Sequence, residues 1–385
     1  MRRAKLVLLA FFFAPLLAAP RAWSAADAPS APELQQRARA RFGVLPAEAK
    51  SAANPITKEK VELGRALYFD KRLSSDGKVS CNSCHVLSSY GVDHEPASLG
   101  HAGPGVARNV PTVYNAALAM QFWDGRAASV EEVAAGSAVN PIAPGMFDPN
   151  QMVKVLRSIP GYAPLFAAAF RGEAQPVTAQ NVGKAIGAFE RRLMTPSRFD
   201  KFLEGETNAL SPAEQAGLAT FIDTGCPKCH TGATVGGKML YKLGVVHPYP
   251  TNDTGRALVT GNAADRYFFK VSSLRNVKET APYFHDGKVK TLEEAVRLMA
   301  HDQLGKELSD AEVAAIIAFL ESLTAPLPTG FIQEPSLPPS PAPAPKRYAC
   351  SARGNAAERR TQNRDGHPLR NLPGGSRPFL GPHPV

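Results

Sequence analysis

Apolar residues recur along the chain at the spacing of amphipathic helices, and polar capping residues mark where several of these segments begin. Two such faces are Met152, Val155, Leu156 and Ile159 after Asp148, and Val182, Ala185, Ile186 and Phe189 after Thr178. Each set follows the i, i+3, i+4, i+7 pattern. Each therefore predicts a helix with one buried face and a side-chain N-cap.

Three further helix starts carry the sequence of a capping box, in which a hydroxyl and a glutamate three residues later satisfy each other's backbone amides. These are Ser211–Glu214, Thr291–Glu294 and Ser309–Glu312. The last two precede Leu292, Ala295, Val296 and Met299, and then Val313, Ile316, Ile317 and Leu320. No segment alternates convincingly between apolar and polar residues, so we predict a mostly α fold with long Gly- and Pro-rich connections.

The N-terminus has the organisation of a cleaved signal peptide. Basic residues at Arg2, Arg3 and Lys5 precede an apolar stretch over 6–19, and Ser24-Ala-Ala26 offers small residues for cleavage. A membrane helix is the alternative, but the stretch is short and polar, Pro-containing sequence follows it. We predict that residues 1–26 are a signal peptide and that the chain has no membrane span.

The C-terminal 60 residues differ in composition from the rest. A Pro-rich stretch over 335–345 leads into a polar, Arg-rich segment without periodicity, so we predict a disordered tail over 326–385. Much of the formal net charge of +10 lies in this tail and in residues 1–26. The body of the protein is close to neutral, so nothing in it indicates a nucleic-acid partner.

Two copies of a haem-attachment motif dominate the chemistry. They are Cys81-Asn-Ser-Cys84-His85 and Cys226-Pro-Lys-Cys229-His230. In such a motif the two thiols add to the haem vinyl groups, and the adjacent histidine is the proximal ligand of the iron. The sequence therefore predicts two covalently bound haem c groups.

Two other interpretations of the cysteine pairs are weaker. A redox-active dithiol needs a βαβ context that the helical pattern does not offer, although Cys226-Pro-Lys-Cys229 has a thioredoxin-like look. A zinc ribbon spaces its two pairs by about 15–20 residues, far less than the separation here. The fifth cysteine, Cys350, lies in the tail.

The distance between the motifs allows each to have a domain of ordinary size. We place an N-terminal haem domain at 45–195 and a C-terminal haem domain at 205–325, joined near Thr195–Gly205. We expect both to be similar to class I cytochromes c.

The sixth ligand of each iron cannot be assigned from spacing alone. Candidates after the first motif are His94 and His101; after the second they are Met239, His247, His285, Met299 and His301. Met299 falls on the apolar stripe of a capped helix, which suits core packing as well as ligation.

Several longer motifs, in one order, resemble bacterial dihaem cytochrome c peroxidases. They are Gly64–Asp70, Leu73–Gly77, Arg108–Asn115, Gln121–Arg126, Ser273–Asn276 and Thr280–Gly287. The resemblance runs from about Leu63 to Thr324. The wider family also includes dihaem enzymes that oxidise side chains of partner proteins, among them enzymes of methylamine utilisation.

The resemblance implies different roles for the two haems. At the N-terminal, low-potential haem, His85 would be proximal and His101 a removable distal ligand at the peroxide site. At the C-terminal, high-potential haem, His230 would be proximal and Met299 distal, because a thioether favours Fe(II) and raises the potential. Electrons would enter at this second haem.

Three further features follow from the same resemblance. Trp123 matches the tryptophan between the haems. Asn109, Thr280 and Pro282 would offer oxygens to a structural calcium. The family's glutamate at the peroxide site corresponds to Ala143, and a nearby glutamine to Val133. Ala143 cannot move a proton, and Glu131 or Glu132, a water molecule or the departed His101 would have to do so instead. The sequence therefore supports electron transfer more firmly than peroxide turnover.

We therefore expect a periplasmic dihaem peroxidase that reduces hydrogen peroxide with electrons from a small c-type cytochrome or a cupredoxin. A dihaem electron carrier and a partner-protein-oxidising enzyme are the alternatives. Loss of the acid favours the carrier, whereas Met299 disfavours the protein-oxidising enzyme. The sequence leaves the oligomeric state open, a homodimer included.

Overall fold

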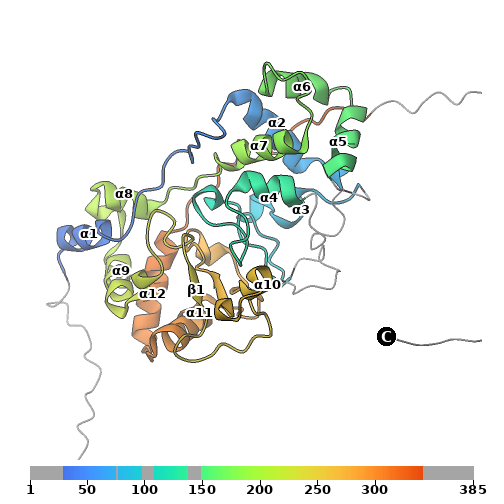
Figure 1. The fold of residues 1–385 in the computed structure, drawn as a ribbon. Coiled ribbons are helices and arrows are strands. Elements are labelled where there is room, and N and C mark those ends of the chain that lie inside the picture. The colour runs from blue at the N-terminus through green and yellow to red at the C-terminus, as the bar shows by residue number, and fades with distance from the viewer. Residues whose placement is uncertain (1–28, 75–76, 98–107, 138–148, 341–385) are drawn as a thin grey trace, which may run out of the picture. The chain divides into compact units, whose positions relative to one another are not determined.

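The computed structural model describes residues 29–74, 77–97, 108–137 and 149–340, and these ranges are mostly helical (Figure 1). The predicted signal peptide, His101, Ala143 and the chain beyond residue 340 lie outside them. None of the helices within the described ranges is long and apolar enough to cross a membrane.

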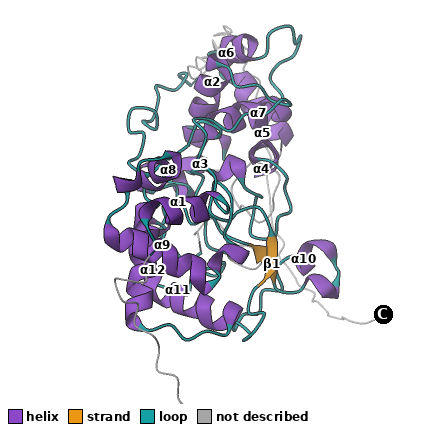
Figure 2. Ribbon diagram, turned by 90° about the vertical axis from the view of Figure 1, so that its left-hand side faces the viewer, coloured by secondary structure: helices purple, strands orange, loops and turns teal. Residues whose placement is uncertain are grey.

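The helices are α1 (Ala31–Arg39), α2 (Lys58–Phe69), α3 (Cys81–Cys84), α4 (Val130–Ser137), α5 (Pro149–Ser158), α6 (Tyr162–Ala169), α7 (Ala179–Glu190), α8 (Arg198–Glu204), α9 (Pro212–Thr224), α10 (Ala257–Thr260), α11 (Leu292–Leu298) and α12 (Asp310–Ser322). Two short antiparallel strands, β1 (Leu240–Lys242) and β2 (Phe268–Lys270), form the sheet of the described chain (Figure 2). The prediction of a mostly α fold is confirmed.

The predicted caps within the described ranges form at the expected residues, whereas Asp148 lies outside those ranges. The Thr178 hydroxyl accepts from the amide of Asn181, and the boxes at Ser211 and Ser309 close in both directions. At Thr291 only half of the box forms, because the Glu294 carboxylate accepts from the Lys290 amide instead. Local sequence therefore fixes where these helices begin.

Two separate apolar cores organise the described chain. The first is built from α2, α5, α6 and α7, with Leu63, Leu156, Phe166 and Phe189 among its buried members. The second is built from α1, α8, α9, α11 and α12, with Leu34, Phe202, Leu218 and Phe319 among its buried members. We call the chain around the first core the N-terminal half and the chain around the second core the C-terminal half.

Each half contains a close crossing of two helices through a glycine. A Cβ at Gly64 of α2 would lie 1.9 Å from the Ala185 carbonyl of α7. A Cβ at Gly217 of α9 would lie 1.9 Å from the Ala315 carbonyl of α12. Any side chain would separate the two helices of either pair, so the same contact is built twice.

A buried hydrogen-bond pattern repeats as well. The backbone N–H of Asn115 donates to the Leu193 carbonyl, and the backbone N–H of Asn276 donates to the Leu323 carbonyl. Both asparagine side chains donate to one atom, the hydroxyl oxygen of Thr195, at 2.7 and 2.9 Å. The two halves thus use equivalent asparagines, which meet at a single threonine.

A tight turn repeats next to these asparagines. In the first half Gln121 pairs with Ala127, and Phe122 has a φ of 60°. In the second half Tyr283 pairs with Val289, and Phe284 has a φ of 66°. The residues that follow these two phenylalanines, Trp123 and His285, therefore occupy equivalent positions.

The prediction that the tail begins at residue 326 is wrong for its first part. Ile332 is 8% exposed in the N-terminal core, and the Phe331 ring lies 5.2 Å from that of Phe189. Arg65 donates to the Gln333 carbonyl at 2.8 Å. The proline content hid a short apolar cluster, and residues 326–340 are therefore part of the fold.

Candidate haem-binding site

The first Cys-x-x-Cys-His motif forms a single helical turn, α3. The Ser80 amide donates to the Ser83 hydroxyl at 3.0 Å and the His85 amide to the Cys81 carbonyl at 2.9 Å. Tyr68 of α2 donates its hydroxyl to the His85 carbonyl at 2.8 Å. The turn is thereby tied to the N-terminal core.

The second motif follows α9 directly. Gly225 ends this helix in the left-handed region, with a φ of 103°, and Cys226–Lys228 form a 3₁₀ turn. The His230 amide then donates to the Cys226 carbonyl at 3.1 Å. The glycine lets the chain turn sharply, so that the motif folds back toward the core.

His230 is oriented and neutral, as a metal ligand must be. Burial lowers the pKa of His230 to about 4. Its Nδ1–H donates to the Val235 carbonyl at 3.3 Å. This hydrogen bond leaves the lone pair of Nε2 available for coordination.

The motif cysteines are not activated thiols. Burial raises the pKa of Cys81 to about 12 and that of Cys226 to about 12. A redox-active dithiol needs a lowered pKa, because the thiolate is the reactive form. These environments disfavour the thioredoxin-like interpretation.

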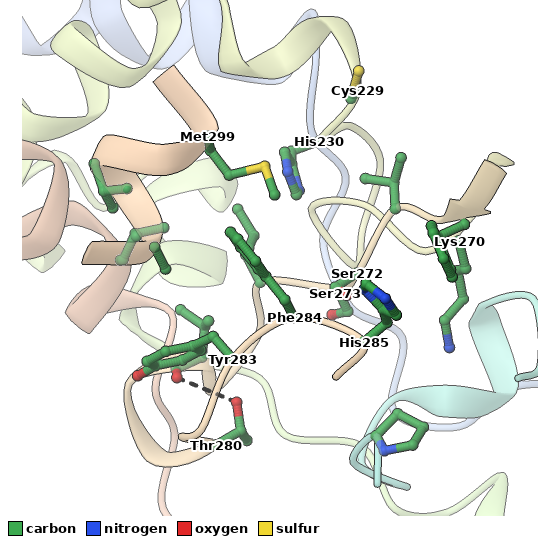
Figure 3. Close-up of a pocket in the computed structure, with 18 of the residues that line it drawn as sticks. Cys229, His230, Lys270, Ser272, Ser273, Thr280, Tyr283, Phe284, His285 and Met299 are labelled. Atoms are coloured by element: carbon green, nitrogen blue, oxygen red, sulfur yellow. Dashed lines mark hydrogen bonds between the residues drawn. The ribbon is translucent and has the colours of Figure 1, made fainter. Parts of the chain in front are cut away.

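A large, mostly apolar pocket adjoins the second motif. Its lining includes Cys226, Cys229, His230 and Met299, and Figure 3 shows the last three of these. In Figure 3 the thioether of Met299 and the imidazole of His230 project into the same part of the pocket. The structure therefore brings Met299 to the three predicted site residues of the second motif, from which it is far apart in sequence.

The backbone at Met299 departs from the predicted regular helix. α11 ends at Leu298, and Met299–Gln303 form a π-helical turn. A π turn shifts the side chains that follow it relative to an α-helix, and such turns are frequent at functional sites. Met299 is half-buried and lines the pocket, so it is not simply a core residue.

The other described candidates for a sixth ligand, His285 apart, lie outside this pocket. His94 is engaged at both ring nitrogens, with Ser89 and with the Ala281 carbonyl. The rings of His247 and His301 stack on each other at 4.2 Å, and Met239 is exposed. Two candidates, His285 and Met299, line the pocket, and of these Met299 projects toward His230.

Trp123 is held at both its backbone and its indole. Its indole N–H donates to the Asn109 carbonyl at 2.8 Å, and its carbonyl accepts from the Lys270 amide at 2.6 Å. Its ring also meets His285 edge-on, with centroids 6.4 Å apart. Trp123 lines the same pocket as His230, so it connects the first half of the chain to the second.

An ion-pair cluster fixes the loop that carries Trp123. Arg108 binds Asp253 through two hydrogen bonds of 2.6 and 2.9 Å and Asp124 through a third of 2.6 Å. Both carboxylates are nearly inaccessible to solvent. Sequence analysis missed this cluster, because Asp253 comes from a distant connection.

The three residues expected to bind calcium all line one pocket. The Asn109 side chain donates to the Glu95 carbonyl, and the Thr280 hydroxyl donates to the Val277 carbonyl. Pro282 lines the pocket beside them. Within the described ranges, no group of three His, Cys, Asp or Glu residues is placed to hold a metal ion.

The described glutamates nearest in sequence to Ala143 are committed to structure. Glu131 of α4 pairs with Arg191 at 2.7 Å and accepts from Asn54 at 2.9 Å. Arg191 lowers the pKa of Glu131 against the opposing effect of burial. Glu132 accepts from the Ala128 amide at the start of the helix. In these positions neither serves as a replacement acid.

Glu190, at the end of α7, is a residue that sequence analysis missed. It is 9% exposed, and burial raises its pKa to about 8. It lies close enough to Cys81 and Tyr68 to raise the pKa of both. Glu190 lies four residues after Ile186, on the buried face of α7. The apolar pattern of the sequence could therefore have predicted that this acid is buried.

A profile of the family described as "Di-haem cytochrome c peroxidase" matches residues 58–208. The chain is 44% identical over 300 residues to cytochrome c551 peroxidase of Nitrosomonas europaea, covering 77% of this chain and 88% of that one. The chain belongs to the di-haem cytochrome c peroxidase family. Members of this family are oxidoreductases, and the family implies two haem groups.

Two further proteins are similar to this chain over most of its length. Cytochrome c551 peroxidase of Pseudomonas aeruginosa is 40% identical over 322 residues, covering 81% of this chain and 92% of that one. A solved MauG-like protein associated with microbial copper homeostasis is 26% identical with a TM-score of 0.66, covering 82% of this chain and 99% of that one. The likeness therefore extends over most of the chain.

The residues around the pocket fit a haem. An apolar lining suits the macrocycle, and the cysteine pair and His230 stand at its edge in the order that covalent attachment requires. A buried ring nitrogen that has no partner among the described residues, Nδ1 of His285, adds a polar group where a ligand can meet it. The pocket supplies both an apolar surface and specific polar contacts.

Proposed function

We propose that this chain is an exported di-haem peroxidase that reduces hydrogen peroxide to two water molecules. The reaction takes up two protons and two electrons, which a small c-type cytochrome or a cupredoxin would supply. The observation that carries the proposal is the pocket in which Cys226, Cys229, His230 and Met299 meet. The names of the relatives support peroxide as the substrate, and the signal-like residues 1–26 support a periplasmic location.

Each haem would be attached and oriented by its own half of the chain. Haem supplies one-electron transfer at its iron and, where one ligand can leave, a place for peroxide. Cys226 and Cys229 would form thioethers, with His230 and Met299 as iron ligands. In the first half Cys81 and Cys84 would form thioethers, with His85 as proximal ligand and His101 as the ligand that leaves.

The two halves would be class I cytochrome c-like domains, at 45–195 and 205–325. The repeated glycine crossing supports this, because it holds two helices of each half in the same close contact. Trp123, held between Asn109 and Lys270, would lie on the electron path from the second haem to the first. We retain a structural calcium at Asn109, Thr280 and Pro282 as part of the proposal, supported by their common position along the pocket.

A second candidate function is a dihaem electron carrier without peroxide turnover. Ala143 stands where the family has an acid, and the nearby described glutamates are engaged elsewhere. A protein-oxidising enzyme, suggested by the likeness to a MauG-like protein, is the third. Met299 counts against it, because the resemblance leads us to expect an oxygen ligand at that position.

Stopped-flow mixing of half-reduced protein with hydrogen peroxide tests the proposal. We expect the bands of oxidised haem to appear at a rate proportional to peroxide concentration. Ala143→Glu should accelerate this reaction about tenfold, because a general acid–base group acts on the transition state, and should leave both haem potentials unchanged. No reaction in either protein would favour the electron carrier; equal rates would mean that another group moves the proton.

A further inference from the structure

The polar groups of the haem pocket are unevenly placed. Among the described lining residues none is Asp or Glu, and Lys270 is the charged side chain. Figure 3 shows Lys270 and His285 together on the side of the pocket away from Met299. This part of the pocket therefore suits a ligand group that is negatively charged.

His285 is locked in place by aromatic rings. Its side chain is 1% exposed, and its ring stacks on Phe269 with centroids 4.2 Å apart. Trp123 and Tyr249 meet the same ring edge-on, at 6.4 and 6.0 Å. The imidazole has little freedom to turn, so its two nitrogens face fixed directions.

The hydrogen bonds around His285 assign its ring proton. The hydroxyl oxygen of Thr251 accepts from the Asp253 amide at 3.1 Å and lies 3.0 Å from Nε2 of His285. The one hydrogen of that hydroxyl can then be donated to Nε2. Burial lowers the pKa of His285, as do Arg108 and Lys288, against Asp286 and Asp253, which favours the neutral ring. Among the described residues Nε2 is the acceptor for the Thr251 hydroxyl hydrogen, so we place the ring proton on Nδ1.

The Nδ1–H donor has no acceptor among the described residues. A buried donor without an acceptor costs free energy, so such an atom beside a ligand pocket points to an acceptor on the ligand. Lys270 provides a second donor, because no described residue accepts a hydrogen bond from its ammonium. Burial lowers the pKa of Lys270 to about 8. A carboxylate would satisfy both groups.

We propose that Nδ1 of His285 and Nζ of Lys270 together bind a propionate carboxylate of the haem held at His230. The inference rests on the proposed function, in which a haem is bound in the pocket at His230. The same residues connect to the electron path: the Lys270 amide donates to the Trp123 carbonyl, and the His285 carbonyl accepts from the amide of Asn109. His285 and Lys270 are thus positioning residues that fix the haem edge relative to Trp123.

The test is a spectroelectrochemical titration of the holoprotein and four variants. His285→Gln places an amide near Nε2 and removes the Nδ1 donor, whereas His285→Asn keeps a donor near Nδ1. Lys270→Met removes the charge. His247→Gln is the matched control, because His247 is exposed and lies outside the pocket.

We expect Lys270→Met to lower the equilibrium constant for reduction of the His230 haem about tenfold, which is ~59 mV, because an uncompensated carboxylate stabilises Fe(III). His285→Gln should shift it in the same direction by a smaller factor, while His285→Asn and the control should not. Adding acetate should change nothing, since a covalently held haem already supplies the carboxylate. A dependence on acetate would mean that the site takes a dissolved anion instead.

Unchanged potentials in both Lys270→Met and His285→Gln, with two haems bound per chain, would overturn the inference. If His285→Gln does not fold, Lys270→Met against Lys270→Arg decides, because arginine keeps the charge. The number of haems per wild-type chain, measured separately, tests whether a haem is attached in this pocket. A chain without haem at Cys226 would overturn the proposed function as well.

Discussion

The two halves of this protein share a frame but differ at single buried positions within it. The clearest difference lies one residue beyond a buried phenylalanine in the last helix of each half. In α12 the residue after Phe319 is Leu320, part of an apolar core, whereas in α7 the residue after Phe189 is Glu190, an acid of raised pKa beside the haem motif. The frame is the same, but at this equivalent position one half has an apolar residue and the other a titratable one.

A second difference lies in the repeated turn. The residue after Phe122 is Trp123, whose indole nitrogen is satisfied, and the residue after Phe284 is His285, whose Nδ1 has no acceptor among the described residues. The comparison teaches that helix crossings and buried asparagines set where each haem motif lies. Individual side chains at equivalent positions then set what each site can do.

Removing one haem tests whether the two halves bind their haems independently, and it has the largest expected effect. Cys226→Ser combined with Cys229→Ser should leave one haem per chain, because each half has its own core and its own motif. The pyridine haemochrome assay and the intact mass would give the count. Loss of both haems would show that the halves cannot fold separately around their cofactors.

Truncation tests which half the last described residues support. A chain ending at Thr324 loses Phe331 and Ile332, which pack on the N-terminal core. Burying each such side chain is worth roughly 1.5–3 kcal/mol, so we expect the unfolding free energy in urea to fall by on the order of 3 kcal/mol. A chain ending at Ser340 is the control and should keep its stability. Equal stability of the two truncated chains would contradict the packing described.

Glu190→Gln should remove a pH dependence of stability that comes from the buried acid of the N-terminal half. The pKa of Glu190 rises from 4.5 to about 8 on folding, so the wild-type protein loses stability as pH rises through that window and no further above it. Each pKa unit is worth about 1.4 kcal/mol, so the variant should gain on the order of 4–5 kcal/mol near pH 8.

Urea unfolding at several pH values would measure this difference. Glu62→Gln is the control, because the side chain of Glu62 on α2 is 62% exposed. Parallel stability curves for wild-type protein and Glu190→Gln would mean that Glu190 is not a buried acid in the folded protein.

Local sequence predicted the features that depend on local chemistry. Caps such as Thr178 fix helix starts through hydrogen bonds within four residues, and the haem motifs carry their own spacing. The position of Met299 beside His230 agrees with the role that the resemblance gave it. Its π-helical turn was missed, because apolar periodicity assumes a regular helix.

Features that depend on distant contacts could not be predicted in the same way. The environment of His285, whose Nδ1 has no acceptor among the described residues, depends on Thr251 and Phe269, which are distant in sequence. The packing of Ile332 was hidden by the proline-rich composition around it. Glu190 was accessible in principle, because it continues the apolar face of α7.

The central claim is that the C-terminal half holds a high-potential haem between His230 and Met299. Potentiometric titration of Met299→His tests it most directly, because imidazole stabilises Fe(III) where a thioether favours Fe(II). We expect the potential of one haem to fall by on the order of 0.1 V, while the other haem keeps its potential. Unshifted potentials at both haems would contradict the claim and leave Met299 as a lining residue without a role at the iron.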